Sequence, residues 1–384
     1  MKRKAIAGAL VAAASLAGTG AANADDSLRL YGVVGAGPGI DIIKYKGKTY
    51  SKSGMQSGLS LFGFEGRHDL GDGLSTRFTL ESGVALMSGE GSTSRLFSRM
   101  ATLGLAHKRY GSIDVGRHYN MAALYMGKVD PFGGSYGLGG DDSTVNAGVR
   151  VDNLVLYQTP NVGGWQGGIG YSFGVNDVAH EAQNQAIIKA LNLPPGAREP
   201  SFFNNKNTRL FTTGIQYAAG PLTAVATYDL ATRRSDAPNA GDDRRLQTYL
   251  VGGAYSLSPF TVYGSFSQVF GGWMSAKNLD HMPTGDDEQF RDFKFAGGFK
   301  ATSMMVGASY ETGPHRIMAS WQQARPNNKR LTNGDSRFDV YAMAYKYQWS
   351  KRTRVSIYGG YATNFAFMKG LKGMSAAVRL RHYF

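Results

Sequence analysis

The sequence predicts an all-β protein, a transmembrane antiparallel barrel of 16 strands, and three observations lead to this fold class. Apolar and polar residues alternate along many short segments, as in GMSAAVRLRHYF at the C-terminus, and a period of two is the strand period. The chain has 52 glycines and 12% aromatic residues, with no cysteine to form disulfides. Beyond the N-terminal region, no apolar run approaches the ~20 residues of a membrane helix. A barrel with aromatic girdles outside and a polar lumen fits these features better than an edge strand of a soluble sandwich.

The N-terminal stretch MKRKAIAGALVAAASLAGTGAANA predicts export. Three basic residues precede a short run rich in Ala and Gly, which closes on the small-x-small site Ala22-Asn23-Ala24. This pattern is typical of a secretory signal peptide. We therefore expect residues 1–24 to be the signal peptide and residues 25–384 to form the barrel.

The charge balance indicates anionic partners other than nucleic acid. The whole chain carries 42 Lys+Arg; without Lys2, Arg3 and Lys4 there remain 39, against 28 Asp+Glu, an excess of +11. The basic residues are scattered singly along strands instead of clustering on a helix, which argues against a nucleic-acid-binding surface.

The strands follow one another from end to end, separated by turn residues. The first is SLRLYGVVGAG, and the last is the C-terminal segment. Between them lie seven hairpins. Their turns are Gly71-Asp72-Gly73, Tyr110-Gly111, the Pro160–Gly164 stretch, Gly220-Pro221, Ser258-Pro259, Gly313-Pro314 and Ser350-Lys351.

The connections at the other end are long and polar, for example Asp177–Asn207 and Gly271–Gly297. Short turns at one end and long segments at the other are typical of outer-membrane barrels, with short periplasmic turns and long external loops. No helices alternate with the strands, so a parallel α/β fold is excluded.

Several runs resemble the Gram-negative general (non-specific) porins, in particular those of beta-proteobacteria. The most specific are GFEGRHDLGDGLSTRFTLESGV and RLFSRMATLGLAHKRYGSIDVGRHYN, and the resemblance extends over nearly all of the mature chain. It implies a trimeric channel of the bacterial outer membrane for passive diffusion of small hydrophilic solutes and ions, without cofactor or catalysis. It also implies contact with outer-membrane lipid and lipopolysaccharide, and a terminal Phe384 that the outer-membrane assembly machinery recognises.

The same resemblance implies that the third external loop folds into the lumen and narrows it. Here that loop is Tyr119–Val149, whose glycines permit sharp bends. Asp130-Pro131-Phe132-Gly133-Gly134 resembles the family's Pro-Glu-Phe-Gly-Gly turn, with the acidic residue displaced by one position. Asp130, Asp141 and Asp142 are candidate carboxylates of the pore constriction, and ordinary solvated loop charges are the alternative.

Alternation along the strands selects the candidate arginines of the pore wall. Arg99 alternates with Met100 and Thr102, taken as lipid-facing, and Arg150 alternates with Val149 and Val151, so both are expected to point inward. Both match positions where the family has pore arginines. Arg77 is inward by the same test, and an ion pair with Glu81 is its alternative role.

The rest of the lumen is expected to be modestly positive. Alternation places Lys346, Arg354, Arg379 and Arg381 inward, against Glu65, Glu81 and Asp152, which predicts weak anion preference. Arg117 shares the outward side with Ile113 and Val115. It is therefore expected at a subunit interface or as a loop anchor, with Glu90 of a neighbouring subunit as its partner.

Two other functional classes were weighed. Gly133–Gly137 matches the G-x-S-x-G motif of barrel or other hydrolases, but that motif needs a strand-to-helix elbow, and the seven histidines lack metal-ligand spacing. The second class is a substrate-selective channel or surface-binding adhesin, for which Asp242-Asp243 and Asp286-Asp287-Glu288 are candidate cation or lipopolysaccharide contacts.

Overall fold

The structure is a computed structural model that describes residues 27–92, 95–133, 148–175, 208–233, 245–274, 293–331 and 335–384. The expected signal peptide lies outside these residues, as do Asp141, Asp142 and the acidic pairs of the later long segments. Within the described chain, no helix is long and apolar enough to cross a membrane.

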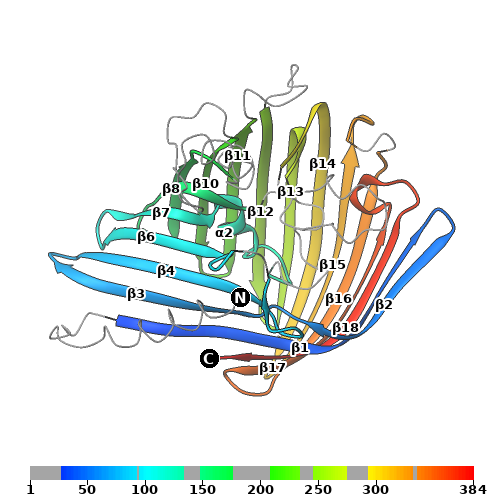
Figure 1. Cartoon of the computed structure of the whole chain (residues 1–384), viewed down its shortest axis with the longest axis horizontal. Helices are drawn as coiled ribbons and strands as arrows, with labels where there is room; N and C mark the ends of the chain where they lie inside the picture. The colour runs from blue at the N-terminus through cyan, green and yellow to red at the C-terminus, as the bar shows by residue number, and fades with distance from the viewer. Residues whose placement is uncertain are drawn as a thin grey trace, which may run out of the picture.

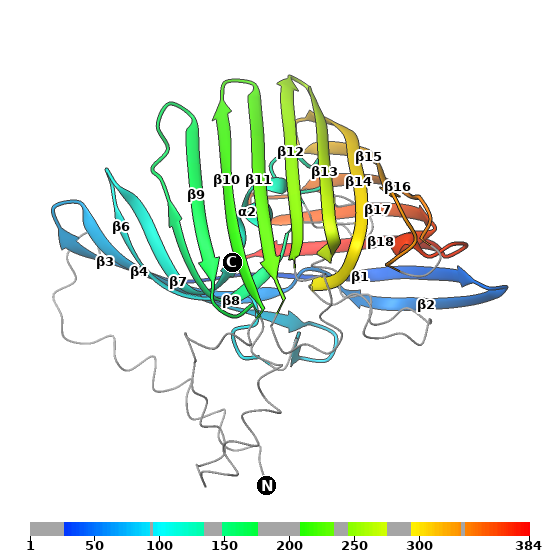
Figure 2. The same ribbon diagram turned by 90° about the horizontal axis from the view of Figure 1, so that it is seen from above.

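Sixteen strands of the described chain form one closed antiparallel ring (Figures 1 and 2). In ring order they are β1 (Ser27–Tyr45), β3 (Leu61–Gly71), β4 (Leu74–Ala85), β6 (Met100–His107), β7 (Gly111–Tyr119), β8 (Arg150–Gln158), β9 (Trp165–Ser172), β10 (Arg209–Ala219), β11 (Leu222–Thr232), β12 (Arg245–Leu257), β13 (Phe260–Met274), β14 (Phe293–Thr312), β15 (His315–Pro326), β16 (Phe338–Gln348), β17 (Thr353–Thr363) and β18 (Lys372–Tyr383). The predicted fold class and strand number are confirmed, and all seven predicted short turns lie between consecutive strands of the ring.

The ring closes where β1 pairs with β18. Val33 lies opposite Tyr383, and the pairing runs on to Lys44 opposite Lys372. Phe384 extends this closure, because its N–H donates to the Gly32 carbonyl (3.1 Å) and its carbonyl accepts from the Gly32 N–H (3.0 Å). The last residue is therefore part of the barrel wall.

Two further strands were not predicted. β2 (Lys48–Ser57) pairs with the second half of β1, from Ala36 to Tyr45, and projects with it beyond the barrel (Figure 2). β5 (Glu90–Gly91) forms a short pairing with the end of β4. The β1–β2 turn has positive φ at both Lys46 (49°) and Gly47 (75°). This is the geometry of a two-residue hairpin turn, and the alternating sequence on either side was its signal.

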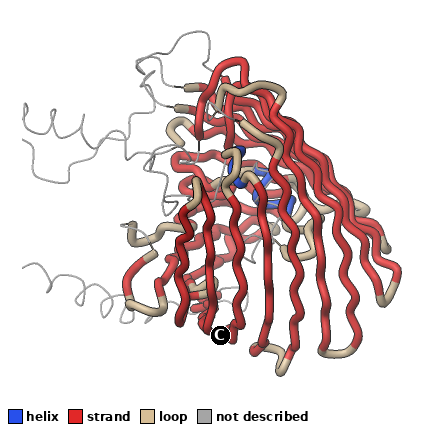
Figure 3. The backbone as a smooth tube through the Cα atoms, turned by 90° about the vertical axis from the view of Figure 1, so that its right-hand side faces the viewer, coloured by secondary structure: helices blue, strands red, loops and turns tan. Residues whose placement is uncertain are grey.

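Alternation separates an outer from an inner face. On β18, Met374, Val378 and Leu380 are exposed, whereas Ala377, Arg379 and Arg381 are buried. On β16, Tyr341 and Met343 are exposed outward, as the sequence predicts, whereas Ala342 and Ala344 are buried. The one described α-helix, α2 (Met121–Met126), lies inside the curve of the strands (Figure 3), so the buried face is the lumen face.

Candidate functional site

The segment after β7 leaves the wall and enters the lumen through α2. Asn120 is the N-cap: its side-chain Oδ1 accepts from the Ala123 N–H (3.1 Å) and from the Val149 N–H (2.9 Å). Its Nδ2 donates to Asp229 Oδ1 on β11 (2.9 Å), and Asn120 and Asp229 are both fully buried. One side chain thus ties both ends of the inward segment to β11, four strands along the ring from β7.

Glycines of the inner wall make room for this segment. A Cβ on Gly168 would lie 2.7 Å from the Met121 side chain, one on Gly252 would lie 2.8 Å from Val129, and one on Gly307 would lie 2.8 Å from Pro131. Because real Cβ atoms do not approach so closely, the missing side chains allow close contact between backbone and loop. The segment therefore runs along the wall from β9 to β14.

The tip of the segment reaches the far side of the lumen. Phe132 is buried against Met318 of β15 and against Ala342 and Ala344 of β16. Arg316 of β15 donates from Nη2 to the Pro131 carbonyl (3.3 Å). Residues 120–133, the described part of the predicted inward loop, thus extend inside the ring of strands from β7 to β15.

Asp130 is not directed into open lumen. It is almost fully buried, and its carboxylate accepts from the Phe132 N–H (3.0 Å), which shapes the turn at Pro131. Asp130 therefore helps to shape the loop tip, and its role as a constriction carboxylate stays a prediction.

Four side chains from four parts of the wall meet near the root of the loop. Arg99 Nε lies 2.5 Å from Glu81 Oε1, and Arg99 Nη2 donates to Tyr119 Oη (2.9 Å). Tyr119 Oη also accepts from Arg150 Nη2 (2.5 Å), and the Arg150 guanidinium stacks 4.4 Å from the Tyr119 ring centroid. The structure thus brings the predicted Arg99 and Arg150 together through a tyrosine that sequence reasoning missed.

The alternation that placed Arg99 and Arg150 inward is wrong in its premise, although the Arg99 side chain contacts the inward Glu81. Val149 and Val151, expected on the outer face beside Arg150, are buried in the cluster that packs against α2. Met100 and Thr102 pair with Glu81 and Thr79, and Leu103 and Leu105 are the exposed residues of β6. Thr102 therefore faces the lumen, not lipid. Arg99 precedes the first residue of β6, where strict alternation does not hold.

Arg77 binds a carboxylate other than the one expected. Its guanidinium pairs with Asp114 of β7 and donates to Ser112 Oγ (2.9 Å), while Glu81 is taken by Arg99. Asp114 is buried on the inner face, whereas its neighbours Ile113 and Val115 are exposed on the outer face. That alternation was visible in the sequence and would have identified Asp114.

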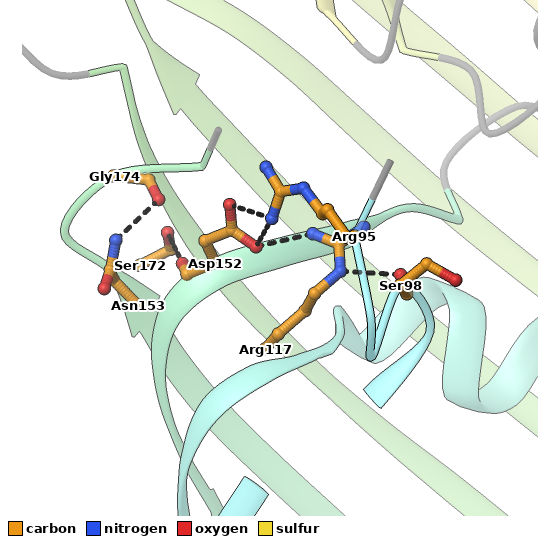
Figure 4. Close-up of polar contacts among 7 residues, drawn as sticks. All are labelled: Arg95, Ser98, Arg117, Asp152, Asn153, Ser172 and Gly174. Atoms are coloured by element: carbon orange, nitrogen blue, oxygen red, sulfur yellow. Dashed lines mark hydrogen bonds and ion pairs between the residues drawn. The ribbon is translucent and has the colours of Figure 1, made fainter. Parts of the chain in front are cut away.

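Arg117 is held inside its own chain (Figure 4). Its Nη1 lies 2.6 Å from Asp152 Oδ1 and its Nε donates to the Ser98 carbonyl (2.8 Å), while Arg95 binds the same carboxylate at 2.7 Å. Asp152 is thereby neutralised and buried, which corrects its expected place among the free lumen carboxylates. A bulge causes the error: Asp152 and Asn153 together oppose Arg117, and Asn153 has φ of +50°.

Glu90 lies in β5 and is exposed, with its carboxylate near the Ser88 hydroxyl. The expected contact between Glu90 and Arg117 is one between subunits, and the structure holds a single chain. Arg117 links β7 to the segment before β6, which is the geometry of a loop anchor.

The expected basic residues of the last strands all lie on the inner face. Arg316 of β15 and Lys346 of β16 are directly opposed in register, and so are Arg354 of β17 and Arg381 of β18. Arg379 is buried, and its guanidinium binds the Gly37 carbonyl (2.8 Å) and Gln56 Oε1 (2.7 Å).

Lys128, between α2 and the loop tip, adds a further cation to the lumen. Its Nζ donates to Gln216 Oε1 (2.5 Å) and lies 5.4 Å from the Tyr125 ring centroid. Burial lowers the pKa of the Lys128 ammonium from the usual value. Among the described residues, no group of three or more His, Asp or Glu side chains is arranged to hold a metal ion.

Comparison with known proteins gives consistent matches. A family model described as Gram-negative porin matches residues 9–365. An outer membrane porin protein of Bordetella pertussis is 37% identical over 403 residues, covering 98% of this chain and 99% of the relative. Outer membrane porin protein 32 of Delftia acidovorans is 27% identical over 375 residues, 94% of this chain and 89% of the relative.

Solved structures match the fold. The anion-selective porin from Comamonas acidovorans superposes with a TM-score of 0.68 at 20% identity, covering 94% of this chain and all of that one. OmpF of Salmonella typhi, solved with daunomycin, superposes with a TM-score of 0.64 at 20% identity over 93% of this chain and 97% of that one.

Proposed function

The chain belongs to the Gram-negative porin family and forms a channel of the bacterial outer membrane, and we propose that small hydrophilic solutes and ions diffuse through it with a weak preference for anions. The finer part of this proposal, the preference for anions, depends on which charges of the lumen remain uncompensated.

The observation that carries the proposal is the pairing of the wall carboxylates. Four acidic groups on or beside the inner wall of the described chain each contact an arginine: Glu65 with Arg29, Glu81 with Arg99, Asp114 with Arg77, and Asp152 with Arg95 and Arg117. Two others contact neutral amides instead, Asp229 with Asn120 and Asp41 with Gln56. A carboxylate in contact with a guanidinium presents little net charge to a passing ion.

Several cations of the lumen are held by neutral groups instead. Arg150 contacts the Tyr119 hydroxyl and ring, Lys128 contacts Gln216, and Arg379 contacts a carbonyl and an amide. These groups orient the cations without cancelling their charge, so the net field in the lumen favours anions. The solved porin of similar fold from Comamonas acidovorans is itself named anion-selective, which supports the same direction.

We also infer that the channel assembles as a homotrimer. The outward side of β1, β6 and β18 is aliphatic, with exposed Leu30, Leu103, Leu105, Val378 and Leu380. Exposed aromatic residues are more numerous on or beside the strands from β9 to β16, among them Trp165, Tyr249, Phe260, Tyr341 and Trp349, although Tyr110 and Phe384 are also exposed beside β6 and β18. Since aromatic girdles mark the lipid boundary, the aliphatic side is the surface expected to contact another subunit. Glu90 is the candidate residue for that contact.

The test is the zero-current potential of single channels in a KCl gradient. Arg150→Glu should shift the potential toward cation preference, and the shift should be larger at 0.1 M than at 1 M salt, since the Debye length falls from about 10 Å to about 3 Å. Lys300→Glu is the matched control, because Lys300 is exposed at an outward position of β14. Cation preference of the unaltered channel, or an equal shift in the control, would overturn the proposal.

A further inference from the structure

Five basic side chains form a patch on the inner wall close to the short-turn end of the barrel. We call this patch the basic stripe: Arg316 of β15, Lys346 of β16, Arg354 of β17, and Arg379 and Arg381 of β18. Arg316, Lys346, Ser356 and Arg379 follow one another in register across the four strands, and Arg354 and Arg381 lie two residues along. The stripe therefore spans four adjacent strands in two rows ~7 Å apart.

The stripe contains two pairs of like charges in direct opposition. Arg316 lies opposite Lys346, and Arg354 lies opposite Arg381. Opposed like charges on one face of a sheet destabilise it, because their Cβ atoms lie about 5 Å apart. Glu311 offsets part of this repulsion, with its Oε2 3.4 Å from Arg316 Nη1. Such an arrangement is more favourable when an anion lies between the cations.

Tyrosine side chains contact the guanidinium groups of three arginines of the stripe. Arg354 lies 5.2 Å from the Tyr383 ring centroid, Arg379 lies 5.7 Å from that of Tyr358, and Arg316 donates to Tyr263 Oη (3.1 Å). The Nε atoms of Arg316, Arg354 and Arg379 are buried without a hydrogen-bond partner among the described residues. Because these Nε atoms are buried, a solute bound at the stripe contacts the guanidinium groups through their terminal nitrogens.

The stripe lies next to the tip of the inward loop. Arg316 binds the Pro131 carbonyl through Nη2, and Phe132 packs against Met318 and Ala342, which lie on the same strands as Arg316 and Lys346. A solute that passes the loop tip on this side therefore meets the stripe on the way to the short-turn end.

We propose that the basic stripe is a binding site for multiply charged oxyanions, and that its preferred solutes are phosphate monoesters. This inference rests on the proposed function, because it requires that solutes traverse the lumen. A phosphate monoester carries up to two negative charges and three acceptor oxygens, which suits several arginines at once, whereas chloride accepts no planar two-point contact. The stripe binds the phosphoryl group and leaves the neutral part of the solute free in the lumen.

The experiment is a titration of the single-channel current with glycerol 3-phosphate, added from the short-turn side at constant KCl. The wild-type current should fall along a saturable curve, and uncharged glycerol should give no such block. Replacing Arg354 and Arg381 together by Gln should raise the half-blocking concentration at least tenfold. Arg354→Lys should raise it several-fold, because the charge is kept and the planar fork is lost.

Arg352→Gln is the matched control, since Arg352 is exposed in the turn before β17 and lies outside the stripe. Its half-blocking concentration should equal that of the wild type. A wild-type channel with anion preference in KCl but no saturable block by glycerol 3-phosphate would overturn the stripe while leaving the proposed function intact. An equal effect of Arg352→Gln and the double replacement would also overturn it. Cation preference in KCl would instead refute the proposed function.

Discussion

Asn120→Ala should release the inward loop from the wall. The change removes two hydrogen bonds to backbone N–H groups and one to the buried Asp229 carboxylate. At about 1 kcal/mol for each neutral bond and about 2 kcal/mol for the charged one, the attached state loses about 4 kcal/mol. Since 1.4 kcal/mol corresponds to tenfold, the detached population should rise by roughly a thousandfold.

The readout is single-channel recording of the purified channel. The Asn120→Ala variant should show a second, higher conductance level and rapid transitions between levels, because a detached loop no longer narrows the lumen. Exchanging the partners, Asn120→Asp with Asp229→Asn, should restore the single level by keeping one carboxylate and one amide in contact. Asn161→Ala is the control, because its one hydrogen bond, to Gly164 N, lies in an exposed short turn.

Wild-type conductance and noise in Asn120→Ala channels that assemble normally would refute this reasoning. Such a result would mean that the apolar contacts of α2 and the loop tip hold the segment without its polar anchor.

Three further outcomes are expected. Deleting Phe384 should lower outer-membrane levels while leaving export intact, because its backbone pairs with Gly32 where the ring closes; normal surface levels by immunoblot would contradict this. Raising the pH should weaken anion preference in the wild type before an ordinary lysine would lose its charge, because burial lowers the pKa of Lys128, and zero-current potentials of Lys128→Met should lack this step. Gly307→Val should displace the loop tip at Pro131 and change the conductance, whereas an unchanged channel would mean that the contact is dispensable.

The barrel could be predicted from the sequence because its signals are local. Each short turn carries Gly, Pro or a polar pair, and each strand between two turns alternates with a period of two. Of the two strands that were not predicted, β2 carried the same kind of signal, a two-residue turn at Lys46-Gly47. The fold could thus be predicted from the sequence wherever the hairpins are regular.

The side chains of the site could be predicted only in part, because alternation identifies inward positions only on regular strands. Alternation placed Lys346, Arg354, Arg379 and Arg381 correctly, because β16, β17 and β18 pair without a register shift. It failed for the roles of Arg99 and Asp152, which lie at a strand start and at a bulge. Partner choice, such as Arg77 with Asp114, depends on which strands are neighbours in the ring and on side-chain reach, and neither is a property of a single segment.

The strand start of β6 and the bulge between β7 and β8, where alternation fails, both lie near the point where the chain leaves the wall. This location affects which charges can act on a passing ion. When the segment after β7 turns into the lumen, the ladder between β7 and β8 must end, and the backbone groups it would have paired need other partners. Asn120 supplies them to Val149 and Ala123, and ion pairs such as Asp152 with Arg117 stabilise the bulge beside it. The carboxylates Glu81 and Asp152 at the root of the loop are thereby neutralised by structural contacts, whereas Arg150 contacts the neutral Tyr119 and keeps its charge. The other charges that act on a passing solute should lie on the regular strands β15–β18, where like charges face one another across the ladder.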